Sequence, residues 1–455
     1  MSARWTRKAC ALSLAGVMII LSLWALGSVS ALELDEIEPE TGTTDAFGGG
    51  AYVAFRLRDA GFAVLYGTEE QPNFITIAAE NTRYLGHAEV WSDGELVRSG
   101  PIAVRSVHAH QLRFALEWRD SDGDGVQRDC VPENNVTAFE AVKGVTLHRA
   151  WTMAGVEEVG ASEGRAWRFS LRAEDLGYDR VWEQGIPRNG TPEDGAVEAM
   201  EFTFHVTITE KEVKAEVPRF NITVERTGMR REVNVERTGS KEYNGTALRC
   251  GFKYDHLIEG WDFESSESRL AIATRGFLGF QVPSDAPEWM RERFKERFMD
   301  RHGAEGTARF CLGTQNMSMN GTWTGVPRLL TRDEVGFDDN WQRVGRFAWT
   351  SQLEVTNMGE TQNLTVRYQV HHGDRLTVDG FGGEFSGFAI GGAFLYPAGE
   401  RLYHDPLMET DALFLGVEGV LPPGIAPWVI AVSIGIAVVV LVGVLAYKRF
   451  RRVQS

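Results

Sequence analysis

Cysteine is scarce in this sequence, with four residues among 455. Cys10 lies in a leading apolar segment, which leaves Cys130, Cys250 and Cys311 in the rest of the chain. No Cys-x-x-Cys pair and no cysteine–histidine spacing typical of a zinc site occurs. Three cysteines allow one disulfide at most. Because the segments around Cys250 and Cys311 both have the pattern of β-strands, we predict that these two residues form it.

Lysine is also scarce, with eight residues against 39 arginines, and the formal net charge is −16. All 63 acidic residues lie between Leu32 and Val420, whereas seven of the 47 basic residues lie outside that range. Nucleic acids and anionic lipid surfaces are bound by basic protein faces, so we exclude them as partners. The acidity is compatible with bound cations or with salty surroundings.

Several signatures of catalysis are absent. The sequence has no H-E-x-x-H motif and no Walker loop, which excludes the zinc proteases and nucleotide hydrolases that depend on them. Strand-like residues follow the glycine-rich run at 381–392, so close packing of strands explains it better than a phosphate cradle. Tryptophans at strand spacing are core residues more often than sugar-stacking platforms, and we interpret five of them as core: Trp151, Trp167, Trp182, Trp261 and Trp349.

Long apolar runs, in contrast, are present at both ends of the chain. Residues 425–447 form 23 consecutive positions without a charge, and about 20 residues of helix cross a bilayer core. Residues 448–455 include four basic side chains, which the positive-inside rule assigns to the cytoplasm. We therefore predict a single transmembrane helix at 425–447 that contacts the lipid bilayer, with the N-terminal ectodomain outside and the tail 448–455 in the cytoplasm.

Residues 1–31 have the pattern of a signal peptide. Three basic residues precede an apolar run, and Val29 and Ala31 suit cleavage before Leu32 by signal peptidase. An uncleaved signal anchor is the alternative, because the apolar run is long. Either interpretation places the chain between the two apolar segments outside the cytoplasm.

Seven asparagines begin an N-x-[ST] sequon, which is the acceptor sequence for N-glycosylation. The serine and threonine content of the ectodomain predicts only about one to two such sequons by chance. We therefore expect a glycoprotein that faces outward. The candidate acceptors are Asn135, Asn189, Asn221, Asn244, Asn316, Asn320 and Asn363.

Alternation of apolar and polar residues with period two dominates the ectodomain. Each alternating segment is bounded by turn-forming residues, which predicts a mainly β fold: an antiparallel β-sandwich-type ectodomain. The repeated Arg-Thr-Gly at 226–228 and 237–239 predicts a hairpin, and the polar stretch 226–244 predicts a boundary between two β-rich parts, at 32–240 and 241–420. The segments are 51–58, 111–118, 166–173, 201–209, 219–225, 269–276, 346–356 and 364–372.

One amphipathic helix is predicted at about 285–302. Ser284 suits its N-cap and Gly303 its end, while Met290, Phe294 and Phe298 recur every four positions on one face. We expect this helix to pack on a sheet. A mobile lid or a helix lying on the membrane is the alternative, and the mixed charges of its polar face argue against membrane binding.

The sequence Asp120-Ser-Asp-Gly-Asp-Gly125 places three carboxylates at alternating positions, with glycines for a tight turn. Oxygen ligands in this arrangement suit Ca²⁺, and an ordinary acidic turn is the alternative. We predict that a structural calcium ion is bound by the side chains of Asp120, Asp122 and Asp124 and the main chain of Val126. Asp129 would complete the shell, with Glu133 as a second possibility.

Histidines offer weaker candidates for chemistry. His108 and His110 alternate on a predicted strand, so their side chains share one face and supply half of a metal site at most. The pairs Asp255-His256 and His404-Asp405 could act in acid–base chemistry if the fold brought them together. A hydrolase would require such convergence in an accessible pocket.

Four segments of the chain are similar to uncharacterised membrane-anchored surface proteins of archaea: 61–73, the loop 120–125, 252–263 and 394–406. The resemblance implies no activity. We therefore expect a non-enzymatic surface protein that binds a partner or forms part of the envelope, its protein or glycan partner being unidentified. A membrane-anchored hydrolase of glycans or peptides, or an accessory subunit of a membrane complex, is the alternative.

Overall fold

The structure is a computed structural model. It describes residues 34, 37–44, 49–57, 60–92, 94–127, 141–178, 195–227, 230–281, 309–312, 315–317, 323–330, 334–339, 342–380 and 383–414. The predicted signal peptide, the helix at about 285–302, the membrane span 425–447 and the tail 448–455 lie outside these residues. Within the described residues, no helix has the length and apolar character needed to cross a membrane.

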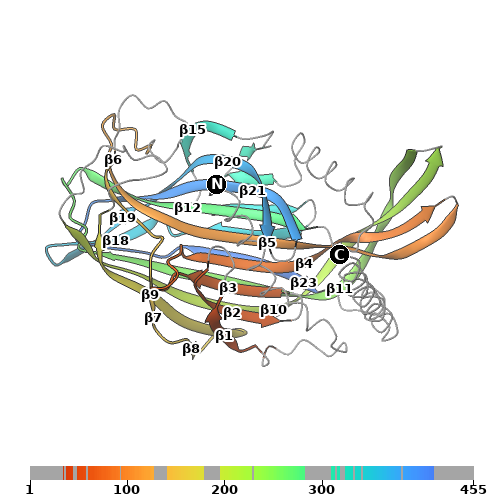
Figure 1. Cartoon of the computed structure of the whole chain (residues 1–455), viewed down its shortest axis with the longest axis horizontal. Coiled ribbons are helices and arrows are strands. Elements are labelled where there is room, and N and C mark those ends of the chain that lie inside the picture. Colours follow the sequence, from red (N-terminus) through yellow and green to blue (C-terminus); the bar gives the residue numbers. More distant parts are fainter. Residues whose placement is uncertain are drawn as a thin grey trace, which may run out of the picture.

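The described chain is built from β-strands (Figure 1). Their bounds are β1 (Pro39–Thr43), β2 (Ala51–Leu57), β3 (Ala60–Tyr66), β4 (Thr76–Ser92), β5 (Glu95–Arg119), β6 (Ala141–Thr146), β7 (Thr152–Met153), β8 (Glu157–Val159), β9 (Arg165–Gly177), β10 (Ala196–Thr227), β11 (Arg230–Glu259), β12 (Ser268–Gln281), β13 (Arg309–Leu312), β14 (Gln315–Met317), β15 (Trp323–Leu329), β16 (Glu334–Asp339), β17 (Gln342–Ala348), β18 (Gln352–Asn357), β19 (Glu360–Thr365), β20 (Arg367–Gly380), β21 (Gly383–Pro397), β22 (Arg401–His404) and β23 (Leu407–Phe414).

Side-chain alternation explains these strands. In β10, Phe202, Phe204 and Val206 are buried, whereas the intervening Thr203 and His205 are half-buried. Successive side chains of a strand point to opposite faces, so an alternating segment buries one face of a sheet. Each of the eight segments predicted from alternation overlaps a strand, and the predicted mainly β, antiparallel fold is confirmed.

The strands form two layers that face each other. Layer A has the order β1-β2-β3-β4-β5-β12-β21-β20-β15, with β6 paired to the later part of β5. Layer B is centred on β9-β10-β11. Beyond β11, one half continues through β22, β18 and β19, and the other half through β23, β17, β16, β13 and β14.

A parallel pairing joins the layers. Residues 219–224 of β10 run alongside residues 87–92 of β4, whereas the other described strand pairs are antiparallel. This connection makes the two layers parts of one continuous sheet, which contains the 23 strands of the described residues and folds over itself.

Aromatic side chains from both layers fill the space between them. The rings of Phe55 (layer A) and Trp167 (layer B) have centroids 4.9 Å apart, and those of Phe62 and Phe252 are 6.3 Å apart. One cluster of buried side chains extends from Ile37 to Met408. Burying apolar area of this extent supplies the main driving force for folding.

A β-bulge in β5 changes which side chains face this core. His108, His110 and Leu112 point inward, but the register with β12 shifts between Ala273 and Thr274. After the shift, Ala115 joins the inner core, whereas Phe114, Leu116 and Trp118 form a separate cluster on the outer face of layer A. An extra residue in one strand reverses the subsequent alternation, which is the reason for the switch.

The two longest hairpins, β4–β5 and β10–β11, extend together past the other strands at one end of the molecule (Figure 1, right). We call their distal parts, residues 87–92, 94–101, 219–227 and 230–238, the arm. The parallel pairing of β4 with β10 lies in it. The arm has its own small apolar cluster of Ala88, Val90, Ile222 and Val224, with Phe220 beside it.

The predicted hairpin near 226–244 is confirmed, since β10 ends at Thr227 and β11 begins at Arg230 in antiparallel register. The predicted division of the ectodomain at residue 240 does not coincide with a structural break. β11 crosses this position without interruption, and a single core contains side chains from both sides of it. A polar stretch therefore marked the distal end of a hairpin rather than a domain boundary.

The predicted disulfide between Cys250 and Cys311 is wrong, because Cys250 is a free thiol buried in the core. Cys250 lies on β11 and Cys311 on β13, and the strands β23, β17 and β16 separate them. Four strand spacings amount to roughly 19 Å, far beyond the span of a disulfide. Burial raises the pKa of the Cys250 thiol well above its ordinary value, which keeps it protonated and unreactive.

Candidate functional sites

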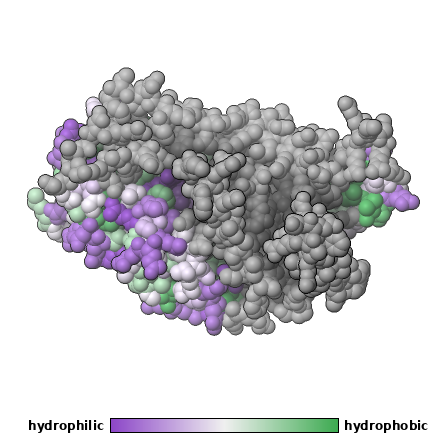
Figure 2. All heavy atoms as spheres, in the orientation of Figure 1, coloured by the Kyte–Doolittle hydropathy of each residue, from purple (hydrophilic) through white to green (hydrophobic). Residues whose placement is uncertain are grey.

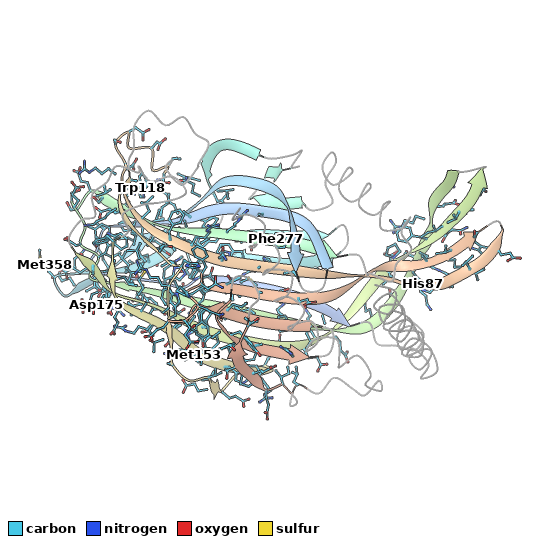
Figure 3. All side chains as sticks on the ribbon, in the orientation of Figure 1. His87, Trp118, Met153, Asp175, Phe277 and Met358 are labelled. Atoms are coloured by element: carbon cyan, nitrogen blue, oxygen red, sulfur yellow. The ribbon has the colours of Figure 1, made fainter. Side chains whose placement is uncertain are left out.

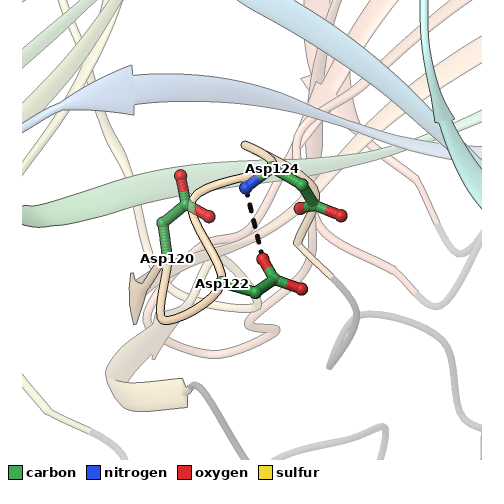
Figure 4. Close-up of side chains that lie close together, drawn as sticks. All are labelled: Asp120, Asp122 and Asp124. Carbon is green, nitrogen blue, oxygen red and sulfur yellow. Dashed lines mark hydrogen bonds between the residues drawn. The ribbon is translucent and has the colours of Figure 1, made fainter.

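The acidic loop follows directly after β5, where Arg119 ends the strand (Figure 4). Main-chain amides of the loop donate to its own carboxylates: Gly125 N to Asp120 Oδ1 (3.1 Å), Asp124 N to Asp122 Oδ1 (3.2 Å) and Val126 N to Asp124 Oδ1 (2.8 Å). Gly123 and Gly125 have φ near +73° and +74°, a conformation that glycine adopts without strain. Local hydrogen bonds and glycine therefore shape the loop.

The fold brings the three predicted carboxylates together. Oxygen atoms of Asp120, Asp122 and Asp124 all lie within 4.8 Å of one another. Such an all-oxygen set suits a hard cation such as Ca²⁺ or Mg²⁺ better than zinc. Arg269 competes for one of these oxygens, because its guanidinium lies 3.2 Å from Asp120 Oδ2.

Two further ligands were predicted. Val126 lies in the loop, where its amide donates to Asp124 Oδ1 and a cation would use its carbonyl oxygen instead, and Asp129 lies outside the described residues. The end of the loop is fixed to β20, since the amide of Gln127 donates to Gln369 Oε1 at 2.9 Å and the Gln369 side chain donates to the Gln127 carbonyl oxygen. Carboxylates and a rigid base are thus in place for a cation.

A chain of hydrogen bonds links two of the predicted histidines inside the core. His256 (β11) and His404 (β22) lie opposite each other in register, 148 positions apart in the sequence. The hydroxyl of Tyr396 lies between them, 3.1 Å from Nδ1 of His256 and 2.9 Å from Nδ1 of His404. On the far side, Nε2 of His404 lies 2.9 Å from the carbonyl oxygen of Thr350.

The direction of each hydrogen bond in this chain follows by elimination. The Thr350 carbonyl can only accept, so Nε2 of His404 donates, and Nδ1 of the neutral ring accepts from the Tyr396 hydroxyl. The hydroxyl has one proton, so it accepts from Nδ1–H of His256. Nε2 of His256 therefore carries a lone pair, and it has no hydrogen-bond donor among the described residues.

Burial keeps these rings neutral. Desolvation lowers the pKa of His404 to about 4 and that of His256 well below its ordinary value. His110 stacks on Phe347 with centroids 4.5 Å apart, and burial together with the nearby His108 lowers its pKa to about 3. Each of these four histidines is at most 3 % exposed.

The neighbouring carboxylates face elsewhere. Asp255 receives hydrogen bonds from Tyr403 (2.7 Å) and interacts with Lys253 and His205 at 3.2 Å. Asp405 also pairs with Lys253 at 3.2 Å. The fold thus brings the predicted pairs Asp255-His256 and His404-Asp405 close together. In each pair, however, the histidine points into the core and the aspartate points to the opposite face of the sheet. The two core histidines are thus enclosed, whereas Asp255 meets the half-exposed His205 on the opposite face.

A buried ion pair that the sequence did not reveal lies between the two layers, close to the acidic loop. Glu117 is fully buried and accepts from Trp261 Nε1 at 3.0 Å and from the amide of Glu264 at 2.8 Å. Lys143 Nζ lies 3.8 Å from Glu117 and 4.6 Å from the centre of the Tyr178 ring. The bulge in β5 turns Glu117 inward, so its position in the alternation gave no signal.

One further motif proves to be structural. Residues 160–164 have the spacing G-x-S-x-G, which in hydrolases forms a strand–turn–helix elbow around the serine. Here they form an exposed connection between β8 and β9, and a strand follows. Ser162 therefore lacks the elbow geometry.

The candidate glycosylation sites differ in accessibility. Asn363 lies exposed on β19, whereas Asn221 is half-buried on β10 with its side-chain oxygen enclosed. Asn244 and Asn316 lie on β11 and β14, and the other three lie outside the described residues.

Four of the five tryptophans interpreted as core are indeed buried: Trp151, Trp167, Trp261 and Trp349. Trp182 lies outside the described residues.

Comparison with known proteins gives no family model and no curated protein that matches the chain.

Proposed function

We propose that this protein is a single-pass, membrane-anchored surface glycoprotein with a non-enzymatic binding or envelope role. In this proposal a signal peptide exports the chain, and a transmembrane helix at 425–447 holds an antiparallel β-sandwich close above the bilayer. A structural calcium ion occupies the loop 120–125. The resemblance to archaeal membrane-anchored surface proteins, the sequons and the charge distribution support the placement outside the cell.

The observation that carries the binding role is the arm. It projects beyond the two layers, and its hairpin tip exposes apolar side chains: Leu96 is 49 % exposed and Val97 65 % exposed. Figure 2 shows hydrophobic residues on this end of the molecule, beside hydrophilic ones. Exposed apolar groups on a projecting element, held in place here by the pairing of β4 with β10, are typical of contact sites for other macromolecules.

The interior supports binding over hydrolysis. The histidines that converge, His256 and His404, are each 1 % exposed and enclosed by aromatic rings such as Phe394. An external substrate cannot reach them without separation of the layers.

Binding of detergent-solubilised full-length protein to isolated cell envelopes of the producing organism tests the role of the arm. We expect the double variant Leu96→Ser/Val97→Ser to lose most of this binding. Met358 provides the matched control: it is 93 % exposed in the β18–β19 turn, at the other end of the molecule from His87 at the arm (Figure 3). Equal binding by the arm variant, the Met358→Ser variant and the wild type would contradict the proposal.

Cell fractionation tests the anchor. The wild-type protein should sediment with membranes and resist extraction by alkaline carbonate. A variant that lacks residues 425–455 should appear in the medium. Retention of that variant in the cytoplasm would overturn both the export and the anchoring.

A further inference from the structure

Two arginines lie side by side in the middle of layer A. Arg113 is at the bulge of β5, and Arg275 on the neighbouring strand β12 pairs in register with Gln111. Arg275 is on the outer face of the layer, because Ile272 and Leu278, each three positions away on β12, point into the inner core. Phe277, two positions after Arg275 and therefore on the same face, packs on a cluster of outer side chains: Leu65, Ala78, Val107 and Ala109. Figure 3 shows Phe277 on β12 near the centre of the molecule.

Neither guanidinium is neutralised by a described residue. Both side chains are half-buried, and the Nε atom of each is fully buried without a hydrogen-bond acceptor in the described part of the chain. Arg113 lies over the ring of Phe74, 4.9 Å from its centre, which satisfies no N–H donor. Burial and the like charge of Arg275 lower the pKa of Arg113.

Other arginines of the same chain show what is missing here. Arg346 also has an Nε atom without a hydrogen bond, but its guanidinium lies 3.4 Å from Glu409 and 3.7 Å from Glu334. Arg165 forms a two-point ion pair with Glu158 at 2.8 and 2.9 Å. These two arginines are thus paired with carboxylates, and acidic residues are abundant in this chain.

Two adjacent, partly desolvated cations repel each other, and buried N–H donors without acceptors cost free energy. A bound oxyanion would remove both costs, since guanidinium groups bind carboxylate, sulfate and phosphate oxygens through paired N–H donors. Polar and apolar groups adjoin the arginines: the amide of Gln111, which donates to Thr76 Oγ1 at 3.2 Å, and the ring of Phe277.

We propose that Arg113 and Arg275 form an oxyanion-binding site on the outer face of layer A, for a small ligand that carries a carboxylate or sulfate group. This site is separate from the acidic loop and from the arm tip, and it depends neither on calcium nor on membrane attachment.

Titration of the full-length protein in detergent with sodium sulfate, and separately with sodium acetate, tests this site. Sodium chloride holds the ionic strength constant, and the unfolding temperature and isothermal calorimetry are the measurements. We expect a saturable rise in unfolding temperature with one or both anions, and about tenfold weaker binding in Arg113→Gln and in Arg275→Gln. The better anion identifies the source: sulfate points to sulfated ligands and acetate to carboxylate ligands.

Arg219→Gln is the matched control, because Arg219 is an exposed arginine already paired with Glu89 at 3.3 Å. It should bind the anion as the wild type does.

In the absence of sulfate and acetate, Arg275→Gln should unfold at a higher temperature than the wild type, because one of two repelling charges is removed. A purely structural arginine would give the opposite change. If Arg113→Gln fails to fold, Arg113→Lys and Arg275→Lys, which keep the charge but lose the paired donors, should still show weakened binding. A wild-type response no larger than that to chloride, or equal affinity in Arg275→Gln and the wild type, would overturn the proposal.

Discussion

At the scale of single residues, the glycine-rich run 381–392 illustrates how close packing limits side-chain size. A Cβ atom at Gly392 would lie 2.8 Å from the carbonyl oxygen of Gln369 and overlap the hydroxyl end of Tyr368. Tyr368 cannot simply turn away, because its hydroxyl is 2.8 Å from Thr274 Oγ1 in the core. The sequence-based interpretation of this run as a place of close strand packing holds at this position.

Gly392→Ala is therefore expected to destabilise the protein by about 1–3 kcal/mol through overpacking. Gly61→Ala is the control, since a Cβ atom there would meet no atom within 4 Å. Chemical denaturation of both variants is the measurement. A Gly392→Ala protein as stable as Gly61→Ala would show that the strands separate readily at this point.

The acidic loop permits a second test at the residue scale. We expect millimolar Ca²⁺ to raise the unfolding temperature of the wild-type protein, because a ligand that binds only the folded state stabilises it. Asp122→Asn should lose most of this rise while keeping the loop, since the amide oxygen of asparagine can still accept from the amide of Asp124.

Glu360→Gln removes an exposed acidic charge from the β18–β19 hairpin and serves as the control for nonspecific charge effects. Ca²⁺ and a chelator that leave the unfolding of the wild type unchanged, together with no calcium by elemental analysis, would show that the loop is an ordinary acidic turn.

At the scale of elements, the arm is a small packed unit supported by two hairpins. Ile222 is 6 % exposed and packs in the arm cluster beside Val224, far along β10 from the main core. Its removal should open the arm locally, since stability is not uniform across a structure.

Ile222→Ala is expected to cost about 2 kcal/mol, the low end of the range for such changes because the cluster is small. Hydrogen exchange should become faster at 87–92 and 219–224, with little change around Phe204 in the main core. Leu96→Ala, at a half-exposed site, should change stability by about 0.5 kcal/mol or less. Equal loss of protection in the arm and in the core would mean that the arm does not unfold separately.

At the scale of the whole molecule, the buried histidines make stability depend on pH. Their pKa values are lowered in the folded protein, to about 3 for His110 and about 4 for His404, whereas the unfolded chain titrates near 6.5. Below pH of about 6.5 the unfolded state binds more protons than the folded state. The stabilisation from neutral rings is thus complete above pH of about 6.5 and declines as the pH falls toward 4 and 3.

Each such histidine should lower the free energy of unfolding by about 1.4 kcal/mol per pH unit in that window. His110→Phe, which keeps a ring against Phe347, should reduce the slope between pH 6 and pH 4.5 by about this amount. His148→Gln, at an exposed position, is the comparison. Denaturation curves at several pH values give the slopes, and identical slopes for His110→Phe and the wild type would contradict the neutral, buried state of this ring.

Much of the architecture could be predicted because strand formation depends on local alternation. The segments around Phe204 and Phe394 read as strands, and the shared face of His108 and His110 followed from spacing alone. The acidic loop was also predictable, because its three carboxylates lie within six consecutive residues and its glycines specify the turn. Predictions failed where a relation between distant strands decided the outcome, as for Cys250 and Cys311, which four strand spacings separate.

The sequence by itself determined the β-rich class, the positions of the strands with clear alternation, the three clustered carboxylates and the expectation of an anchored surface protein. Tertiary structure alone decided that Tyr396 joins His256 to His404 in the core and that the bulge of β5 turns Glu117 inward. It also decided that Arg113 and Arg275 lie near each other with no counter-charge among the described residues. The physical reason is that alternation is a property of neighbouring residues. Strand register, which determines which side chains of two strands lie opposite each other, depends on pairing between segments far apart in the chain.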